Sequence, residues 1–343
     1  MHPANFFKNA CIIAAIFICN LFFTAGNKAY SNEEIRKAQQ KGIIFLKHIQ
    51  RSDGAICDTV NPLFETWETI LAVSAIYKAN PDTNVPVVKK GLSFLRHNEN
   101  SKGLICHNQK CKTAYCLETT AVYFSLLKLV GQNEKIIPVL KKINSLQKQT
   151  GEWDIGNPDV TIQKDFPSVT AFVLELLHNT GVEPVYKKEA IGWLLEKQTK
   201  RGDWGSAWEY YGCPAYALWP VMKVLQHENT KEARLAKDKA VAFILAAQNK
   251  DGSWFYKDAA SAKQTSAELQ TALMLSALQN AGIKSNEAIL KGINFLVSNQ
   301  QKNGNWDGGY FPIPENRYSK QEYVFATALA VEVLHNYLLN NSN

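Results

Sequence analysis

The sequence lacks three patterns that would point to common classes of protein. No stretch shows sustained alternation of apolar and polar residues, so no β-strand is predicted. The formal net charge is +7, but the lysines are dispersed and form no compact basic block, which argues against nucleic acid as a partner. Neither a Cys-x2-Cys pair nor a His-x3-His pair is present, so no metal or cofactor is expected.

Long apolar runs are also scarce. Residues 11–23 form an apolar run of 13 residues, interrupted at Asn20. This run is too short for a comfortable membrane span but has the size of a signal-peptide core. We therefore expect a signal peptide over residues 1–29, cleaved at about residues 25–29, and export to the periplasm or beyond the cell. An uncleaved N-terminal anchor is the alternative. After cleavage, no stable membrane span is expected.

A repeat runs through the rest of the chain. The pattern Gln-x3-Gly-x-Trp occurs at residues 147–153, 198–204, 248–254 and 300–306. Variants without the Trp occur at 50–56 and, with Glu in place of Gln, at 99–105. The six motif glycines are spaced 48 to 52 residues apart. Such regular self-similarity is the mark of a repeat architecture, in which neighbouring units stack to bury their apolar faces.

Each repeat predicts a pair of helices, because apolar residues recur at three- and four-residue spacing on both sides of the motif. The first helices are predicted over residues 41–49, 90–98, 139–146, 190–197, 239–247 and 291–299. The second helices are predicted over residues 68–79, 118–129, 169–179, 215–225, 269–279 and 325–334. The second set is richer in Ala, Ser and Thr, which favours an inner position. The prediction is therefore one all-α domain over residues 30–343.

These repeats resemble the QW motifs of squalene-hopene and oxidosqualene cyclases, and the hairpin period is similar to that of protein prenyltransferase β subunits. The resemblance covers residues 35–340 and implies a single (α/α)6 toroid of six helical hairpins with a central apolar cavity. It also implies a small apolar or isoprenoid-like ligand that enters where the inner helices begin. The sequence carries no indication of the oligomeric state.

Aligning the inner helices on their small residues places acids and aromatics at that entrance. The candidates for acid or base catalysis are Glu118, Glu68 and Asp165. The candidates for binding are Glu65, Trp67, Tyr115, Phe166, Tyr211, Cys213, Tyr216, Glu268, Glu322 and Tyr323. An acid in the first turn of a helix is, taken alone, more often a partner of the helix dipole. Acids near the helix start in most of the six repeats strengthen the functional interpretation for the set.

The resemblance fails at the cyclase acid. The bacterial cyclases protonate with an Asp-x-Asp-Asp-Thr-Ala motif, whose nearest match here is CLETTAV, residues 116–122. Glu118 takes the last acidic position, and Leu117 stands where the protonating Asp would be. The enzyme class favoured is a cyclase-like isomerase or lyase without the usual motif. A non-catalytic binding or scaffold toroid is one alternative. A carbohydrate-active lyase or hydrolase, using Trp67, Trp208 and Tyr310, is the other.

Five cysteines lie beyond the expected signal peptide, and the odd number leaves at least one thiol unpaired within the chain. Cys57 and Cys106 occupy equivalent positions in repeats one and two. One or two disulfides are expected among Cys57, Cys106 and Cys111. Zinc on Cys106, His107, Cys111 and Cys116 is the less favoured alternative. Cys116 and Cys213 begin inner helices, where a thiol is either reactive or a small buried residue.

Overall fold

The computed structural model describes residues 29–58, 64–134, 136–156, 166–205, 213–257, 264–311 and 320–341. The expected signal peptide lies outside the described residues, apart from Ala29. Among the described residues, no helix is both long enough and apolar enough to cross a bilayer.

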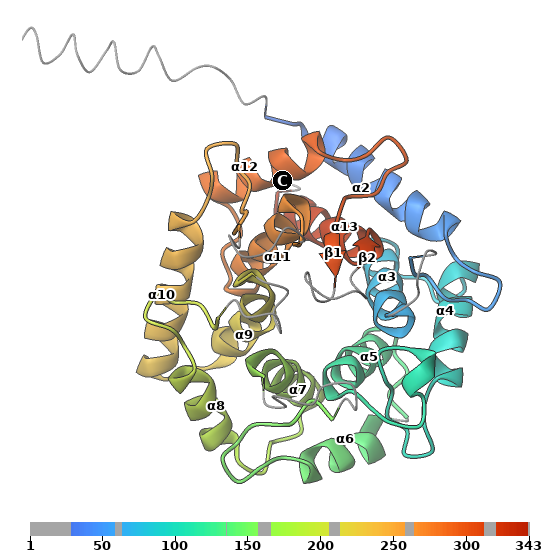
Figure 1. The fold of residues 1–343 in the computed structure, drawn as a ribbon, viewed down its shortest axis with the longest axis vertical. Coiled ribbons are helices and arrows are strands. Elements are labelled where there is room, and N and C mark those ends of the chain that lie inside the picture. Colours follow the sequence, from blue (N-terminus) through green and yellow to red (C-terminus); the bar gives the residue numbers. More distant parts are fainter. Residues whose placement is uncertain are drawn as a thin grey trace, which may run out of the picture.

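The described helices form two concentric rings (Figure 1). The outer ring is α2 (Asn32–His48), α4 (Pro86–His97), α6 (Ile136–Ser145), α8 (Lys187–Glu196), α10 (Lys231–Ala246) and α12 (Glu287–Ser298). The inner ring is α3 (Glu65–Ala79), α5 (Leu117–Leu129), α7 (Pro167–Thr180), α9 (Ala215–His227), α11 (Ala267–Asn280) and α13 (Val324–Asn340). Each inner helix contacts the next, and α13 returns to contact α3, so the inner ring is closed. The predicted all-α toroid of six hairpins is confirmed.

Two short strands depart from the all-helical prediction. β1 (Gly309–Phe311) pairs antiparallel with β2 (Lys320–Glu322) just before α13. Each strand has three residues, too few for alternation to be recognised in a sequence. The prediction that the chain contains no strand was therefore wrong at this one place.

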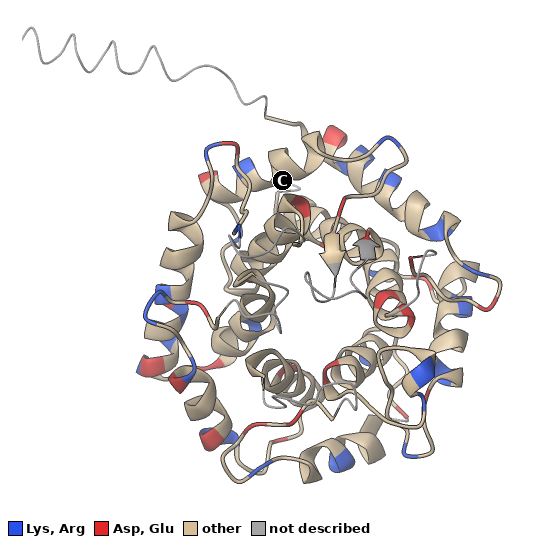
Figure 2. Ribbon diagram, in the orientation of Figure 1, with Lys and Arg blue, Asp and Glu red and all other residues tan. Residues whose placement is uncertain are grey.

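The two rings differ in how they bury side chains. α4 is amphipathic and buries Val87, Val88, Gly91, Leu92, Phe94 and Leu95 on one face. α3 is enclosed by neighbours, and all its residues from Glu65 to Ile76 are buried. Figure 2 accordingly shows most basic residues on the outer ring. A helix enclosed on all sides favours the small residues that distinguish the second helix of each repeat in the sequence.

The repeated glutamine joins each hairpin to the next one. In repeat four, the Gln198 amide donates to the carbonyl oxygen of Gly202 at 2.9 Å and to that of Ala236 in α10 at 2.8 Å. The same pair of bonds is made by Gln50, Gln147, Gln248 and Gln300. Gln300 reaches Ala38 in α2, so the last repeat is tied to the first. The repeated Gln therefore ties neighbouring hairpins together through backbone carbonyl groups.

The repeated tryptophan has two roles. The indole N–H of Trp254 donates to the carbonyl oxygen of Ile244 in the preceding outer helix, at 2.7 Å. The ring packs on the next outer helix at Gly292, where a Cβ atom would come within 2.7 Å of it. Trp306 lies in the same way against Gly42 of α2. The Trp therefore ties its turn to the neighbour through ring packing, while its one donor is satisfied within its own repeat.

Candidate active site

Aromatic rings meet across the toroid axis within the first two turns of the inner helices. They are Trp67 from α3, Phe172 from α7, Tyr216 and Trp219 from α9, and Phe325 from α13. The ring centroids of contacting pairs are 5.1 to 6.4 Å apart, in mostly edge-to-face geometry. All five side chains are buried. This aromatic cluster presents π faces and ring edges in a water-poor setting, which suits an apolar ligand or a developing positive charge.

Glu118 lies in the first turn of α5, on the α7 and α9 side of the aromatic cluster. It is buried, and its Oε1 atom has no hydrogen-bond partner among the described residues. Burial raises the pKa of Glu118 to about 7, although the hydroxyls of Ser168 in α7 and Tyr216 in α9 pull it down. The carboxyl is therefore half protonated near neutral pH, the range in which an acid can both give and take a proton.

A second group of acids lies on the α3 and α13 side. Asp58, Glu68 and Glu322 each offer a carboxylate oxygen, and these oxygens all lie within 4.8 Å of one another. Glu68 accepts from the Asp58 N–H at 2.9 Å, and Asp58 accepts from the Tyr323 N–H at 3.0 Å. Burial first, and mutual repulsion second, raise the pKa of Glu68 and of Glu322 well above the ordinary value. At neutral pH these acids must share protons.

Two of these three acids were predicted from the sequence. Glu68 and Glu322 belong to the register of the inner-helix starts, whereas Asp58 does not. Asp58 follows the motif turn and enters the cluster from the loop side, so the helix register could not identify it. Burial raises the pKa of Asp58 to about 6.

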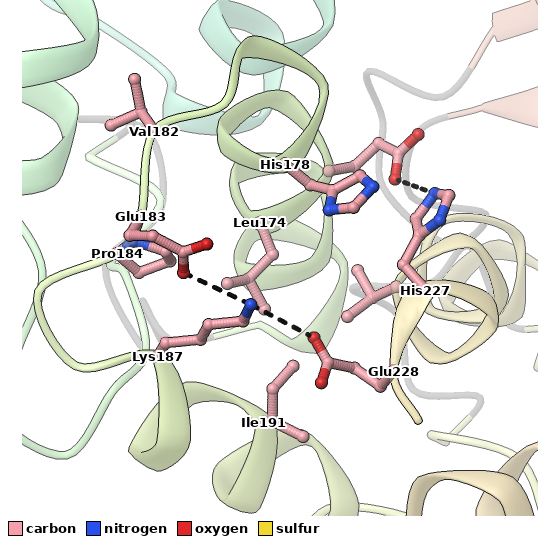
Figure 3. A pocket seen from close by; sticks show the side chains of 11 residues that line it. Leu174, His178, Val182, Glu183, Pro184, Lys187, Ile191, His227 and Glu228 are labelled. Atoms are coloured by element: carbon pink, nitrogen blue, oxygen red, sulfur yellow. Dashed lines mark ion pairs between the residues drawn. The ribbon is translucent and has the colours of Figure 1, made fainter. Parts of the chain in front are cut away.

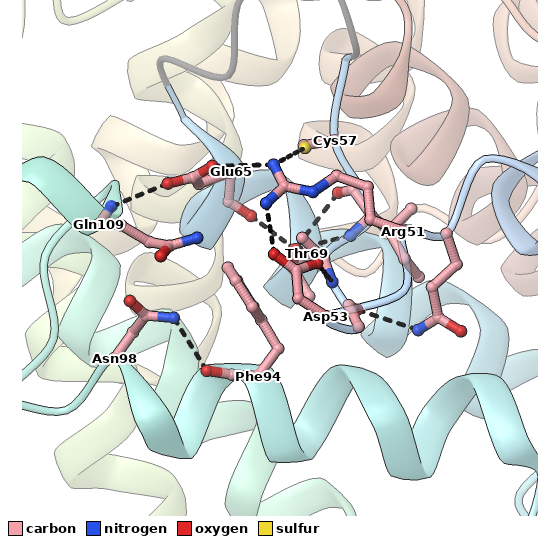
Figure 4. A network of polar contacts seen from close by, with 12 residues as sticks. Arg51, Asp53, Cys57, Glu65, Thr69, Phe94, Asn98 and Gln109 are labelled. Carbon is pink, nitrogen blue, oxygen red and sulfur yellow. Dashed lines mark hydrogen bonds and ion pairs between the residues drawn. The ribbon is translucent and has the colours of Figure 1, made fainter.

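Glu65 begins α3 but faces the turn of the first repeat (Figure 4). Arg51 donates to its carboxylate at 3.2 Å, and the backbone N–H of Gln109 donates at 3.0 Å. Arg51 also pairs with Asp53. Because both carboxylate oxygens have protein partners, Glu65 joins the first two repeats at the edge of the candidate site.

The remaining described candidates lie at the predicted helix starts, and Tyr323 contacts the second acid group through its backbone N–H bond to Asp58. Phe166 and Tyr323 are the residues just before α7 and α13. Tyr115 packs over Gly156, where a Cβ atom would lie 2.2 Å from its ring. Glu268 lies in the first turn of α11, and burial raises its pKa. Asp165, Tyr211 and Trp208 lie outside the described residues.

The cysteines divide into one pair and three buried thiols. Cys106 and Cys111 form a disulfide with Cα atoms 5.8 Å apart, within the predicted set. Cys57, the third disulfide candidate, is a free buried thiol. Burial raises the pKa of Cys116 to about 12 and that of Cys213 to about 11. Both thiols are buried, which agrees with the alternative of a small buried residue at these two positions.

A small cavity opens at the opposite ends of α7 and α9, against α8 (Figure 3). Its volume of ≈ 30 Å³ is room for roughly one or two waters. The ring of His178 stacks on that of His227 with centroids 4.0 Å apart, and His227 Nε2 lies 3.4 Å from Glu175. These histidines lie near the ends of helices in different repeats, so no local sequence pattern could pair them.

Known proteins match both the repeats and the fold. The family described as squalene-hopene cyclase C-terminal domain matches residues 154–323. The squalene–hopene cyclase of Zymomonas mobilis is 32% identical over 131 residues, which are 36% of this chain and 20% of that protein. The squalene–hopene cyclase of Bradyrhizobium diazoefficiens is 25% identical over 177 residues, 48% of this chain and 26% of that protein. The chain thus spans about a fifth to a quarter of the length of these relatives.

Solved structures show the same fold. The type II terpene cyclase MstE from Scytonema superposes with a TM-score of 0.72 at 17% identity, over 91% of this chain and 100% of that one. A variant of MstE in complex with its substrate geranylgeranyl dihydroxybenzoate gives a TM-score of 0.69 at 17% identity, over 90% of this chain and 98% of that one. Together with the sequence matches, these similarities show that the chain has the fold of an α/α toroid and is similar to terpenoid cyclases in both sequence and structure.

Proposed function

We propose that this toroid is exported, binds an isoprenoid-like ligand at the inner-helix starts, and isomerises or cyclises it by acid catalysis with Glu118 as the proton donor. The observation that carries the proposal is the buried Glu118 carboxyl, with a pKa raised to about 7, placed beside Tyr216 of the aromatic cluster. A carboxyl kept protonated near neutral pH can protonate an alkene only if water is excluded, and burial provides that condition.

The reaction needs no co-reactant. The Glu118 O–H proton adds to one alkene carbon of the ligand, and the π electrons form the new C–H bond. A neighbouring alkene then attacks the carbocation to close a ring, or the cation moves directly to proton loss. A carboxylate, regenerated Glu118 or a member of the Asp58, Glu68 and Glu322 group, accepts the final proton. Product and substrate have the same formula, and the aromatic cluster stabilises the cationic stages.

The prenyl character of the ligand is supported by the relatives. MstE binds geranylgeranyl dihydroxybenzoate, and the matched curated relatives include squalene–hopene cyclases. The carbohydrate-active alternative needs two separated carboxylates along a polar groove. The close packing of Asp58, Glu68 and Glu322 favours shared protons over that arrangement.

A non-catalytic binding toroid is the second candidate. It is favoured by Leu117, which is buried and stands where the cyclase motif would place its proton donor. In that case Glu118 is a buried acid without a reaction, and the aromatic cluster alone binds the ligand.

Turnover in D2O separates the two candidates. The purified chain is incubated with squalene and with a geranylgeranylated dihydroxybenzoate, and products are analysed by mass spectrometry. Acid catalysis gives a product that carries one deuterium, formed at a rate that falls as the pH rises through about 7. Binding measured by Trp fluorescence without any product supports the binding toroid.

Variants then test the donor. Glu118→Gln should retain ligand binding and helical circular dichroism but lose at least about 100-fold in turnover, since general acid catalysis typically contributes 10²–10⁴-fold. Glu287→Gln, an exposed change on α12, is the matched control and should be fully active. Unchanged deuterium incorporation in Glu118→Gln would remove Glu118 from the mechanism.

Export is tested apart from activity. Expression of the full chain with its native N-terminus should yield a mature protein that begins near residues 25–29, as read by N-terminal sequencing of a periplasmic fraction. Retention of Met1 in the cytosolic fraction would contradict the proposed export.

A further inference from the structure

Three metal-ligating side chains gather in the loop between α4 and α5. Cys106, His107 and Cys111 each offer one donor atom, and these atoms all lie within 4.8 Å of one another. His107 Nδ1 is 3.6 Å from each of the two sulfurs. The three residues are buried, at 1%, 6% and 8% exposure. The proposed function uses none of them.

The distances suit a tetrahedral ion. Zinc binds thiolate sulfur at about 2.3 Å and imidazole nitrogen at about 2.0–2.1 Å, so a tetrahedral angle separates the two donors by roughly 3.6 Å. The nitrogen already lies at this distance from both sulfurs. The two sulfurs of such a site are roughly 3.8 Å apart, a separation within reach of cysteines whose Cα atoms are 5.8 Å apart once the S–S bond is open.

We propose that Cys106, His107 and Cys111 form a redox-gated site for a thiophilic divalent metal ion, with Zn²⁺ as the preferred occupant. A dithiol reductant supplies two electrons and two protons, the S–S bond breaks, and the reductant becomes a disulfide. Zn²⁺ then binds both thiolates and the neutral imidazole, and the two thiol protons are released. Three protein donors leave one coordination position for water. The disulfide and the bound metal use the same two sulfur atoms and therefore cannot be present together.

The site is coupled to the start of α3. The carbonyl oxygen of His107 accepts the N–H groups of Thr66 and Trp67 at 3.1 and 3.3 Å. The rings of Phe64 and His107 lie 5.1 Å apart. The loop that carries the donors is thus the N-terminal cap of α3, the helix that places Trp67 in the aromatic cluster. Metal binding should be visible in the tryptophan fluorescence of the chain.

Metal content tests the proposal directly. The full chain is reduced anaerobically with a dithiol, desalted, exposed to Zn²⁺ and desalted again. We expect about one Zn²⁺ per reduced chain and less than about 0.1 per oxidised chain. Co²⁺ in place of Zn²⁺ should give thiolate charge-transfer and tetrahedral d–d bands. A reduced chain that binds no more Zn²⁺ than the oxidised chain overturns the site.

Variants assign the donors. Cys106→Ser/Cys111→Ser should abolish binding, and His107→Ala should weaken it at least about tenfold. Cys57→Ser removes a free buried thiol from the neighbouring repeat and should bind as the parent does. Loss of binding in Cys57→Ser alone would assign the metal to other thiols and overturn the proposal.

Alkylation of the parent chain removes any dependence on whether the variants fold. In the reduced chain, Zn²⁺ should protect Cys106 and Cys111 from iodoacetamide, as mapped by peptide mass spectrometry. Equal labelling of these two cysteines with and without Zn²⁺ would contradict the site.

Discussion

The side-chain amide of Gln300 donates to the carbonyl oxygen of Ala38 at 2.8 Å, across 262 positions of sequence. Its second bond, to the carbonyl oxygen of Gly304, is also 2.8 Å. The four equivalent glutamines each join adjacent hairpins, and only Gln300 among these five joins the last repeat to the first. Ring closure therefore uses the same side chain and geometry as repeat stacking.

Gln300→Ala should destabilise the fold by about 1–3 kcal/mol, because two hydrogen bonds in a half-buried position are lost together. Urea denaturation measures the loss. Hydrogen exchange should rise in α2, which Gln300 ties to repeat six. The neighbouring Gln301→Ala, an exposed change, is the control and should stay within about 0.5 kcal/mol. Equal effects of the two substitutions would contradict the role in closure.

Gly304→Ala tests why the motif needs glycine. Gly304 has φ +100°, and a Cβ atom there would lie 2.5 Å from the Lys41 carbonyl oxygen in α2. The substitution combines left-handed backbone strain with a backbone clash and should cost more than about 2 kcal/mol. Gly131→Ala is the matched control, with φ +77° and no atom within 4 Å of the added Cβ, and should cost only about 1 kcal/mol. Thermal unfolding of both variants gives the comparison, and a Gly304→Ala protein as stable as Gly131→Ala would rule out the clash.

The fold could be predicted from the sequence because the information repeats. Each copy carries the Gly and two helices of opposite character, and five of the six carry the Gln, so an ambiguous helix prediction in one copy is resolved by the others. The positions of Glu118 and Glu68 in the first turns of inner helices could be predicted from the same alignment of the repeats. Among the described residues, the strands β1 and β2 are confined to one repeat, and they are too short to show a periodic pattern in the sequence.

The site could be predicted only in part, because some of its side chains lie outside the positions that the alignment of inner-helix starts identifies. Asp58 arrives from a loop, and Trp219 and Phe172 lie one turn or more inside their helices. The pairing of Cys106 with Cys111 rather than with Cys57 depends on the path of a loop. Burial, which sets the pKa of Cys116 and of Glu118, depends on neighbours from other repeats that no local pattern encodes.

Trp67 tests the aromatic cluster. Its ring contacts Phe172, Trp219 and Phe325, and its Nε1 atom has no hydrogen-bond partner among the described residues. Trp67→Ala should therefore cost about 3–5 kcal/mol through the cavity it leaves, and Trp67→Phe clearly less. Guanidinium denaturation measures both. Trp193→Ala, a half-buried change on the outer helix α8, is the control and should reduce the free energy of unfolding clearly less than Trp67→Ala does. If Trp67→Ala reduces it no more than Trp193→Ala, the aromatic cluster does not stabilise the toroid.

Glu118 should contribute to the pH dependence of the free energy of unfolding. Its pKa is about 7 in the folded chain and 4.5 when unperturbed, with burial as the main cause. Between these values the folded chain keeps a proton that the unfolded chain has lost, so the contribution of Glu118 makes stability fall as pH rises from about 4.5 to about 7. Glu118→Gln cannot ionise and should lack this component, which makes it more stable than the parent at pH 8 by on the order of 3 kcal/mol and equal to it near pH 4.5.

Urea denaturation of the parent and of Glu118→Gln from pH 4.5 to pH 8 measures this difference. Asp58, Glu68 and Glu322 also carry raised pKa values, but they titrate in both proteins and cancel in the comparison. Glu287→Gln removes an exposed carboxylate whose pKa is lowered by its hydrogen bond to Lys291, so its difference from the parent should not grow between pH 5 and pH 8. A stability difference between Glu118→Gln and the parent that stays constant across this range would mean that Glu118 is ionised at neutral pH, and would remove it as a proton donor.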